Sequence, residues 1–514
     1  MLIQKEKYKK TTLVAAAVLA AMTLSACNDS NDSTTAARSS SKPKNIILMI
    51  SDGASWNTWE MGAEWQAGVS ANALPAYADM DVRLGMTTYP LTTSSSPTND
   101  ANGDGLSYDA DKAWDESAAE VDASDSYQTA IAGYQYLKSN FTDSAAAGTA
   151  LSTGQKTYNN AINYDNLGQP LSYITQLAKA AGKTTGVVTT VQLSHATPAT
   201  FAAQNISRKN MTAIAQDMLT NGNVDLLMGT GNPGYDGNGS DMSALSDEEC
   251  AATYACYTPY DTIGQTEWTE LKAGELIPSG ASTPWTLIES KASFEALANG
   301  SLSVSGPLVG IPKVRWTLQQ GREASVLGAD ASQPSGVKKI ATVPDLATMT
   351  QGALNYLGQG ESGFFLMVEG GAVDWAAHAN QADRMVEEQV DFNQALQAVE
   401  EWVAANSSWD ETLLIVTTDH GNALPLGMDS DSVPYQSLTF NGAAALPAVR
   451  FWSGNHTNEL VRLWARGQGS EAFSSLVRGQ DATFASKVGQ NDEGDYVDNT
   501  DVFTVMQAAL PSDE

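Results

Sequence analysis

One stretch near the start of the chain decides the fold class: Ile46-Ile47-Leu48-Met49-Ile50-Ser51-Asp52-Gly53. Its apolar residues follow one another without a polar break, and a serine, a carboxylate and a glycine end the run. Continuous apolar runs of this length suit strands buried on both faces, as in a parallel sheet that helices cover. The stretch therefore predicts a buried strand that carries Asp52 at its carboxyl end.

Four further runs have the same character, and helix-like stretches lie between them. The runs are residues 186–191, 224–228, 364–368 and 413–417, and the clearest helical stretches are residues 171–181 and 382–403. Strand and helix thus alternate along the chain, which indicates an α/β fold. We expect a mostly parallel central sheet flanked by helices on both faces.

Two stretches interrupt this alternation. Residues 94–140 are acidic and poor in aliphatic side chains, and residues 232–341 are long and rich in Gly and Ser. Long irregular segments in a compact domain often carry function, although many do not. We interpret both as insertions into one domain at residues 44–514. They either form a cap, rim or partner surface, or merely decorate the domain.

The N-terminus has the pattern of an export signal. Lysines at positions 5, 7, 9 and 10 precede an apolar stretch at residues 13–24, which closes with Leu24-Ser25-Ala26-Cys27. A positive region before a short apolar segment is typical of a secretory signal, and the closing residues resemble a bacterial lipoprotein signal. We predict a signal peptide at residues 1–26 and a lipid anchor on Cys27. Plain secretion with cleavage near Ala26 is the alternative.

The segment after the signal is polar. Residues 27–43 are rich in Ser, Thr, Asn and Asp, and such a composition predicts a flexible tether. No later segment offers about 18 uninterrupted apolar residues, so we expect no transmembrane helix there. The expected location is therefore the periplasm, the outer membrane or the cell surface of a Gram-negative bacterium.

The net charge of the chain excludes some classes of binding partner. Lys and Arg total 28 against 59 Asp and Glu, which gives a net charge of −31 at pH 7. Such a surface repels nucleic acids and anionic membranes, so neither is expected as a partner of the folded domain. An anionic substrate would need a locally positive site, which metal ions can supply.

The cysteines predict one disulfide. The chain has three, and with Cys27 lipidated the remaining pair is Cys250 and Cys256, six positions apart. Thiols are oxidised outside the cytoplasm. No other Cys or His lies near this pair, which argues against a zinc knuckle.

Acidic residues follow three of the predicted strands. Asp52-Gly53 ends the first, Glu369-Gly370-Gly371 follows residues 364–368, and Asp419-His420-Gly421 follows residues 413–418. Open α/β sheets place their ligands at the carboxyl ends of the strands. One such Asp alone is more often a helix N-cap. Three buried carboxylates together are costly unless cations neutralise them, so the set predicts a metal site.

The four histidines strengthen the metal hypothesis. His378 follows Asp374 by four residues, so both side chains face one side of a helix; His420 adjoins Asp419; and His456 lies in the Gly-containing loop at residues 453–457. The fourth is His195. A lone histidine is usually structural, but each of these lies in or beside an acidic or Gly-flanked motif. Imidazole with carboxylate suits zinc, and an all-oxygen set suits magnesium.

The candidate nucleophile is Ser144. It lies in Thr142-Asp143-Ser144-Ala145-Ala146-Ala147-Gly148-Thr149-Ala150, where small residues follow the serine at a predicted helix start. The positive end of a helix favours an anion at this position. An ordinary N-cap serine is the alternative. Zinc bound to the hydroxyl oxygen would lower its pKa and make it a nucleophile.

Taken in order, the motifs resemble those of alkaline phosphatases of the bacterial and animal type. The matching segments are Asp52-Gly53, Asp143-Ser144, His195-Ala196-Thr197-Pro198-Ala199, Glu369-Gly370-Gly371, Asp374-Trp375-Ala376-Ala377-His378, Asp419-His420-Gly421 and Gly454-Asn455-His456-Thr457. They frame residues 44–510, outside the two insertions. One motif would be weak evidence, but the ordered set is specific.

The resemblance implies two Zn²⁺ ions and one Mg²⁺ ion, held by three ligand sets. The first zinc set is Asp374, His378 and His456. The second is Asp52, Asp419 and His420. The magnesium set is Asp52, Thr197 and Glu369. His195 and Trp375 would lie in the surroundings of the magnesium, and Trp375 stands where other members carry Lys or His.

The resemblance also implies an activity. Ser144 would attack small phosphate monoesters and form a phosphoserine, and Arg208 would grip two phosphate oxygens, a task that suits its planar guanidinium. Since these contacts address the phosphoryl group, we expect a broad range of leaving groups. Members of the family usually form homodimers. Phe141 departs from the family, which usually has a β-branched aliphatic residue there.

Other functions remain open at this point. A sulfatase needs its nucleophile in a Cys/Ser-x-Pro-x-Arg context, which Ser144 lacks, whereas a phosphodiesterase of the superfamily is a closer rival. A lipid-anchored phosphate-binding protein without turnover is a third reading. Separately, Asp100, Asn102 and Asp104, with Asp111 at the twelfth position, resemble a calcium loop. Short acidic loops without calcium are the alternative.

Overall fold

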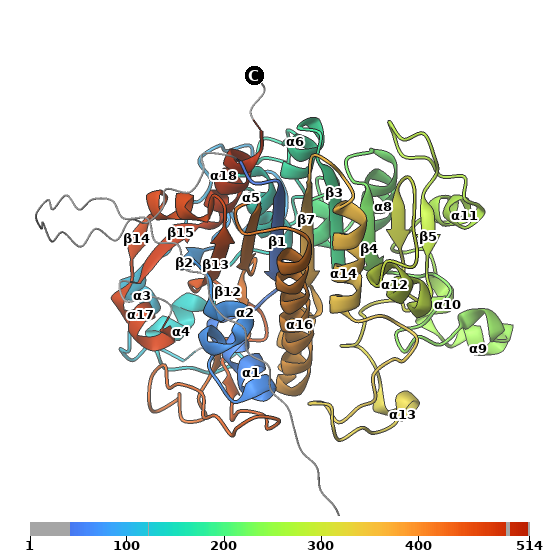
Figure 1. Cartoon of the computed structure of the whole chain (residues 1–514). Helices are drawn as coiled ribbons and strands as arrows, with labels where there is room; N and C mark the ends of the chain where they lie inside the picture. Colours follow the sequence, from blue (N-terminus) through green and yellow to red (C-terminus); the bar gives the residue numbers. More distant parts are fainter. Residues whose placement is uncertain (1–41, 122, 490–493, 512–514) are drawn as a thin grey trace, which may run out of the picture. The chain divides into compact units, whose positions relative to one another are not determined.

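The computed structural model describes residues 42–121, 123–489 and 494–511 (Figure 1). The signal peptide, Cys27 and nearly all of the tether lie outside these residues, so their predictions stay predictions. In the described part, no helix combines the length and apolar character needed to cross a bilayer.

The described residues form a sheet of 11 strands (Figure 1). Its order is β14 (Gly479–Gln480), β15 (Asp495–Asp498), β2 (Val82–Thr87), β13 (Val461–Gly467), β8 (Thr412–Thr417), β1 (Asn45–Ser51), β7 (Phe364–Gly370), β3 (Thr184–Gln192), β4 (Leu226–Thr230), β6 (Leu308–Gly310) and β5 (Thr286–Ile288). From β8 to β5 every pair is parallel. β13 is antiparallel to both of its neighbours, and β14 is antiparallel to β15. The predicted α/β class and mostly parallel sheet are confirmed.

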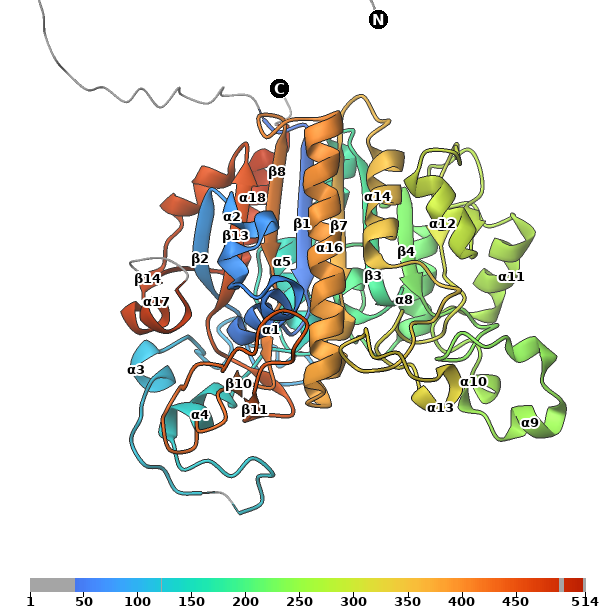
Figure 2. The ribbon, with the colours of Figure 1, turned by 60° about the horizontal axis from the view of Figure 1, so that its bottom comes forward.

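Helices cover both faces of the sheet, because side chains along each strand alternate between two cores. On β1, Ile46, Leu48 and Ile50 enter one core, and Ile47 and Met49 enter the other. The first core packs against α5 (Ser144–Thr153), α6 (Ile174–Ala180), α8 (Met211–Thr220) and α18 (Asn499–Ala509). The second packs against α1 (Trp56–Ala67), α12 (Lys291–Ala298), α14 (Leu346–Leu357) and α16 (Ala382–Asn406). Figure 2 looks onto this second face, with α16 in front of β1 and β7.

Shorter elements complete the described chain. The helices are α2 (Pro75–Ala78), α3 (Ala110–Ala113), α4 (Ala132–Leu137), α7 (Ala196–Thr200), α9 (Asp247–Ala251), α10 (Tyr254–Tyr257), α11 (Gln265–Ala273), α13 (Ala324–Leu327), α15 (Ala372–His378) and α17 (Ala482–Val488). Three 3₁₀ turns are η1 (Ala71–Ala73), η2 (Met242–Ala244) and η3 (Ser470–Ser475). Two small antiparallel ladders join β9 (Gly421–Asn422) to β12 (His456–Thr457) and β10 (Pro425–Leu426) to β11 (Arg450–Phe451).

Both predicted insertions take part in the packing. The stretch at residues 94–140 contributes Ala113, Ile131, Tyr134 and Leu137 to a separate apolar cluster with Trp56. The stretch at residues 232–341 contains β5 and β6, which extend the edge of the main sheet. In the same stretch Cys250 and Cys256 form the predicted disulfide.

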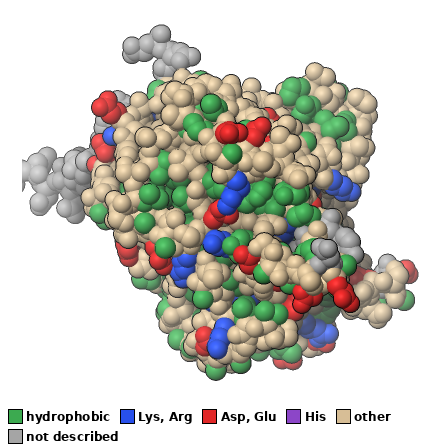
Figure 3. Space-filling view, turned by 90° about the vertical axis from the view of Figure 1, so that its right-hand side faces the viewer, with side chains coloured by type: hydrophobic (Ala, Val, Ile, Leu, Met, Phe, Trp, Pro, Cys, Tyr) green, Lys and Arg blue, Asp and Glu red, His purple; other side chains and the backbone are tan. Residues whose placement is uncertain are grey.

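Charged side chains of both signs are scattered over the face shown in Figure 3. On this face, the Lys and Arg side chains stand apart from one another and do not gather into one basic patch.

Candidate active site

The parallel register brings the strand-end carboxylates to one edge of the sheet. Ile50 of β1 pairs with Glu369 of β7 on one side and with Thr417 of β8 on the other. Asp52 and Asp419, which come two residues after these paired positions, therefore lie beside Glu369. All three side chains are fully buried. The edge is the carboxyl end of the parallel strands, where open α/β sheets bind ligands.

Burial makes these acids costly as bare carboxylates. Desolvation, together with the neighbouring Asp419, Asp374 and Glu369 charges, raises the pKa of Asp52 well above its usual range. Desolvation also raises the pKa of Glu369 to about 8. Within the described chain, Asp52 Oδ1 and Glu369 Oε1 accept no hydrogen bond. A buried carboxylate oxygen without a hydrogen-bond donor is a candidate ligand for a cation.

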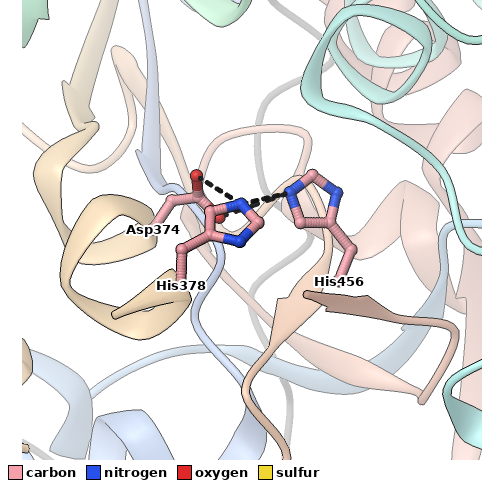
Figure 4. Close-up of side chains that lie close together, drawn as sticks. All are labelled: Asp374, His378 and His456. Carbon is pink, nitrogen blue, oxygen red and sulfur yellow. Dashed lines mark hydrogen bonds and ion pairs between the residues drawn. The ribbon is translucent and has the colours of Figure 1, made fainter. Parts of the chain in front are cut away.

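Asp374, His378 and His456 form the first of two groups whose candidate ligand atoms lie within 4.8 Å of one another (Figure 4). Asp374 and His378 come from α15, and His456 from β12. His378 Nδ1 lies 3.0 Å from the carbonyl oxygen of Gly454, and His456 Nδ1 lies 2.8 Å from that of Thr142. A carbonyl only accepts, so each Nδ1 carries a proton.

This arrangement turns the two Nε2 atoms toward one another and toward Asp374. The two Nε2 atoms are 3.1 Å apart, and they lie 3.4 and 3.5 Å from the Asp374 carboxylate oxygens. A cation placed among these atoms would be within reach of all three side chains. One carboxylate and two imidazoles suit zinc, and the hydrogen bonds on the far side of each ring are those that orient metal-binding histidines.

Asp52, Asp419 and His420 form the second such group, and it is completely buried. His420 Nε2 lies 3.1 Å from Asp419 Oδ2 and 3.6 Å from Asp52 Oδ1. The other Asp419 oxygen accepts from the backbone N–H of Gly53 at 3.1 Å. Gly53 has φ +68°, and a Cβ there would lie 2.6 Å from Asp374 Oδ1. Only glycine therefore fits where the two groups meet.

The predicted magnesium ligands also lie together. Thr197, in α7, donates its hydroxyl to Asp52 Oδ2 at 3.3 Å. Glu369 Oε2 accepts from the Thr189 hydroxyl. All candidate ligand atoms of this set are oxygens, the ligand type that Mg²⁺ prefers.

Ser144 is the first residue of α5. Its neighbour Asp143 caps the helix by accepting from the Ala146 N–H at 3.0 Å. Ser144 Oγ lies 3.1 Å from His420 Nε2, so the hydroxyl borders the second group. The helix's positive end faces the same place. Phe141 stands where the family usually has a β-branched aliphatic residue. Its ring centroid lies 5.7 Å from that of His456, so the aromatic side chain packs beside this histidine.

Arg208 lines the same cavity as Ser144. Two side chains hold its guanidinium. Its Nη1 donates to Asp143 Oδ2 at 3.0 Å, and its Nη2 lies 3.3 Å from His195 Nε2. Burial, and then the Arg208 charge, lower the pKa of His195 to about 3, so this imidazole is neutral. Asp143 thus both caps the helix that begins at Ser144 and positions the Arg208 guanidinium.

Sequence reasoning missed one residue of this region, Asn422. Its Nδ2 donates to Asp374 Oδ1 at 2.7 Å. Its backbone exchanges hydrogen bonds with the Ser55 hydroxyl, which also bonds the buried Glu459. The available signal was the position of Asn422 directly after Asp419-His420-Gly421, but its contact depends on the β9–β12 ladder, which no local pattern predicts.

A cavity of about 650 Å³ opens above these groups. Seven of the predicted residues line it: Ser144, His195, Arg208, Asp374, Trp375, His378 and His456. The five others, which lie beneath it, are Asp52, Thr197, Glu369, Asp419 and His420. The fold therefore brings all twelve predicted site residues to one place, although their roles stay predictions.

The predicted calcium loop at residues 100–111 does not gather its candidate ligands as the two groups above do. Asp100 Oδ1 accepts from the Asn102 N–H at 2.9 Å, as in an ordinary turn, and Asp104 accepts from Thr93 at 3.3 Å. Among the described residues, neither of the two compact ligand groups includes any member of this loop. The calcium prediction stays untested.

Comparison with known families agrees with the motifs. The alkaline phosphatase family model matches residues 108–241 and 321–502. The chain belongs to the alkaline phosphatase family. The unmatched stretch between the two segments lies within the predicted insertion at residues 232–341.

Individual alkaline phosphatases are similar to this chain over different spans. One from Escherichia fergusonii is 30% identical over 387 residues, which cover 72% of this chain and 74% of the relative. Alkaline phosphatase 4 from Bacillus subtilis is 33% identical over 288 residues, or 55% of this chain. That match spans 49% of the relative, so the chain aligns with only about half the length of this alkaline phosphatase.

Solved structures of alkaline phosphatases share the fold. The enzyme from the Antarctic bacterium TAB5 superposes with a TM-score of 0.56 at 20% identity, covering 92% of this chain and 99% of that one. The Thermus thermophilus enzyme gives a TM-score of 0.55 at 20% identity, covering 92% of both chains.

Proposed function

We propose that this protein hydrolyses phosphate monoesters through a covalent phosphoserine on Ser144. The observation that carries the proposal is the position of Ser144 Oγ at a helix start, beside two built ligand groups and in the same cavity as Arg208. Membership of the alkaline phosphatase family supports the reaction class.

The donor sets support two Zn²⁺ and one Mg²⁺. Asp374, His378 and His456 would hold the first zinc, and Asp52, Asp419 and His420 the second. Asp52, Thr197 and Glu369 would hold the magnesium. When bound, these cations would neutralise the buried carboxylates, offset the charge of the phosphoryl oxygens and lower the pKa of the Ser144 hydroxyl.

The chain's own groups bind and orient the phosphoryl group. Arg208 offers N–H donors to two phosphoryl oxygens, and its contact with Asp143 fixes the direction of the guanidinium. The Ser144 oxygen attacks phosphorus in line with the ester oxygen, so a bond from phosphorus to Oγ forms as the bond to the alcohol breaks. Water then displaces Oγ, which releases inorganic phosphate and restores the serine.

The remaining proposals concern location and assembly. We keep the lipoprotein signal at residues 1–26, the anchor on Cys27, export to the periplasm or cell surface, and a homodimer as proposals. Mass spectrometry of the mature N-terminus would detect a lipidated Cys27, and light scattering in solution would give the mass of the assembly. An unmodified N-terminus near residue 27, or a monomer, would contradict the respective proposal.

The deciding experiment compares a monoester with a diester. The zinc- and magnesium-loaded protein without residues 1–43 should hydrolyse p-nitrophenyl phosphate at alkaline pH far faster than bis-p-nitrophenyl phosphate. Acid-quenched samples should carry phosphate on the Ser144 peptide by mass spectrometry. Ser144→Ala should abolish both signals, whereas Ser152→Ala, in the same helix but away from the cavity, should keep both.

Other outcomes would redirect the assignment. Efficient diester cleavage with slow monoester turnover would indicate a phosphodiesterase. Phosphate binding without turnover of either compound would indicate a binding protein.

A further inference from the structure

The cavity is larger than a phosphoryl group requires. Its volume of about 650 Å³ falls in the range that holds a whole small-molecule ligand. Ser144, Arg208 and the two ligand groups occupy its floor. The outer wall is therefore available to the rest of the ester, the part that leaves as the alcohol.

Trp375 is the largest side chain of that wall. It lies in α15 between the candidate ligands Asp374 and His378, and it is only half-buried. Its ring centroid is 5.8 Å from that of His195, at an interplanar angle of 56°. Among the described residues the indole nitrogen has no hydrogen-bond partner. A half-exposed indole in a cavity, without a partner of its own, is suited to contact a ligand.

The other wall residues add apolar and amide groups. Met211 starts α8 and contributes a polarisable thioether side chain, which adapts well to aromatic neighbours. Gln320 donates its amide N–H to Gln381 at 3.0 Å, which fixes its orientation at the rim. Asn160 supplies a second amide to the lining. An aromatic face, a thioether and two amides match a flat, heteroatom-bearing ring better than an aliphatic polyol.

Charge at the mouth favours an anionic ester. Lys209 follows Arg208, lines the cavity and is exposed, and its ammonium makes no ion pair within the described chain. In a chain with a net charge of −31, an unpaired cation beside the guanidinium draws anions toward this opening.

We propose that this outer wall makes nucleoside 5′-monophosphates the preferred monoesters, with the base stacked on Trp375. The inference rests on the proposed function and narrows its substrate class. Removing an aromatic side chain that stacks on a base weakens binding about 5- to 100-fold. Such stacking predicts a measurable preference over aliphatic esters that present the same phosphoryl group.

The test separates the base from the phosphate. AMP and glycerol 3-phosphate are compared with the metal-loaded protein, and the reported quantity is the ratio of their kcat/KM values. Effects on metal binding or on the phosphoryl group act on both esters and cancel in this ratio. Trp375→Ala should lower the ratio about 10-fold, whereas Trp375→Phe should keep it within about 3-fold. Trp268→Ala, which removes a half-buried tryptophan outside the cavity, should not change it.

A binding measurement gives a readout independent of turnover. In the Ser144→Ala background, adding Trp375→Ala should weaken AMP binding about 10-fold by calorimetry. The affinity for glycerol 3-phosphate should stay nearly constant.

The outcomes distinguish this inference from the proposed function. An unchanged ratio in Trp375→Ala, with both esters hydrolysed, would overturn base stacking and leave the phosphatase intact. A wild-type ratio near one would overturn the preference in the same way. Hydrolysis of neither ester by the wild-type protein would overturn both proposals together.

Discussion

Buried acidic groups occur in two regions of this molecule, and the two regions treat them differently. On α16, Glu387 is buried and meets Arg322 Nη1 at 2.8 Å, Arg384 Nη1 at 3.3 Å and the Ser335 hydroxyl at 2.6 Å. These donors lower the pKa of Glu387 below its usual range, although burial opposes them. We call these four residues the Glu387 cluster.

At the strand ends, two of the acids each have one oxygen without such a partner. Asp52 Oδ1 and Glu369 Oε1 accept no hydrogen bond from the described chain, and their pKa values are raised. The Glu387 cluster is thus complete as folded, whereas the strand-end set is complementary to ions that the chain does not itself provide. The difference separates a carboxylate that the fold itself neutralises from carboxylates that the proposed ions would neutralise.

Metal removal should give the largest effect and should act on one region only. Chelation should lower monoester turnover by at least about 1000-fold, since the electrostatic stabilisation of the transition state is lost. It should also lower Tm, because ions that bind only the folded chain stabilise it. Activity assays and thermal melts with and without chelator would measure both. Full activity in the apoprotein would break the comparison.

Disrupting the Glu387 cluster should affect stability instead of chemistry. Glu387→Gln leaves the two buried arginines without their carboxylate, which should cost about 3–5 kcal/mol in the free energy of unfolding. Denaturant titration would measure this loss. The folded fraction should keep its kcat, and a large drop in kcat at unchanged stability would place the cluster in the site.

Glu388, the neighbour of Glu387, should have the opposite effect on stability, and this effect should depend on pH. Burial, and then Asp391 and Glu387, raise its pKa to about 8 from an ordinary value of 4.5. Between these pH values the unfolded chain gives up a proton that the folded chain retains, so Glu388 makes stability fall as pH rises.

Glu388→Gln should therefore be more stable than wild type at pH 9, by about 2–4 kcal/mol, and nearly equal to it at pH 4. Glu387→Gln is the matched control, since it should lose stability at neutral pH. Urea titrations of both variants across this pH range would show the opposite signs. A Glu388→Gln variant less stable than wild type at pH 9 would contradict the argument.

The smallest effect is expected at the disulfide, which bears no buried charge. Replacing Cys250 and Cys256 by Ser should cost at most about 2 kcal/mol, because the closed loop is short. Turnover should not change, since neither residue lines the cavity. Parallel melts and assays of the double variant would test this, and loss of turnover would tie this edge of the molecule to the site.

Strands and ligands were predictable to different degrees. β1, β7 and β8 could be predicted because both of their faces are buried, which produces unbroken apolar runs. β13 was not predicted because its sequence contains Arg462, whose burial is compensated by an ion pair with Glu60 at 2.7 Å. That partner lies 402 positions away in the chain, so no local pattern reveals it.

The candidate ligand residues could be predicted because they lie in short sequence motifs with a fixed order of residue types. Asn422 could not be predicted, since its contact with Asp374 arises from the pairing of two distant two-residue strands. Trp375 of the outer wall lies within the motif at residues 374–378 and could be predicted, whereas Met211 and Gln320 could not, because they come from separate parts of the chain and belong to no motif.

The position of Asp143 has a consequence for how this molecule can change over generations. One carboxylate fixes both the start of the nucleophile's helix and the direction of the guanidinium, so these two groups move as a unit. Among the outer-wall residues, Asn160 contacts this unit through its backbone N–H to Asp143 Oδ1 at 3.0 Å, whereas Trp375 and Gln320 make no hydrogen bond to it among the described residues. On the proposed function, substitutions at Trp375 or Gln320 would therefore change which esters are accepted without removing a contact of Asp143.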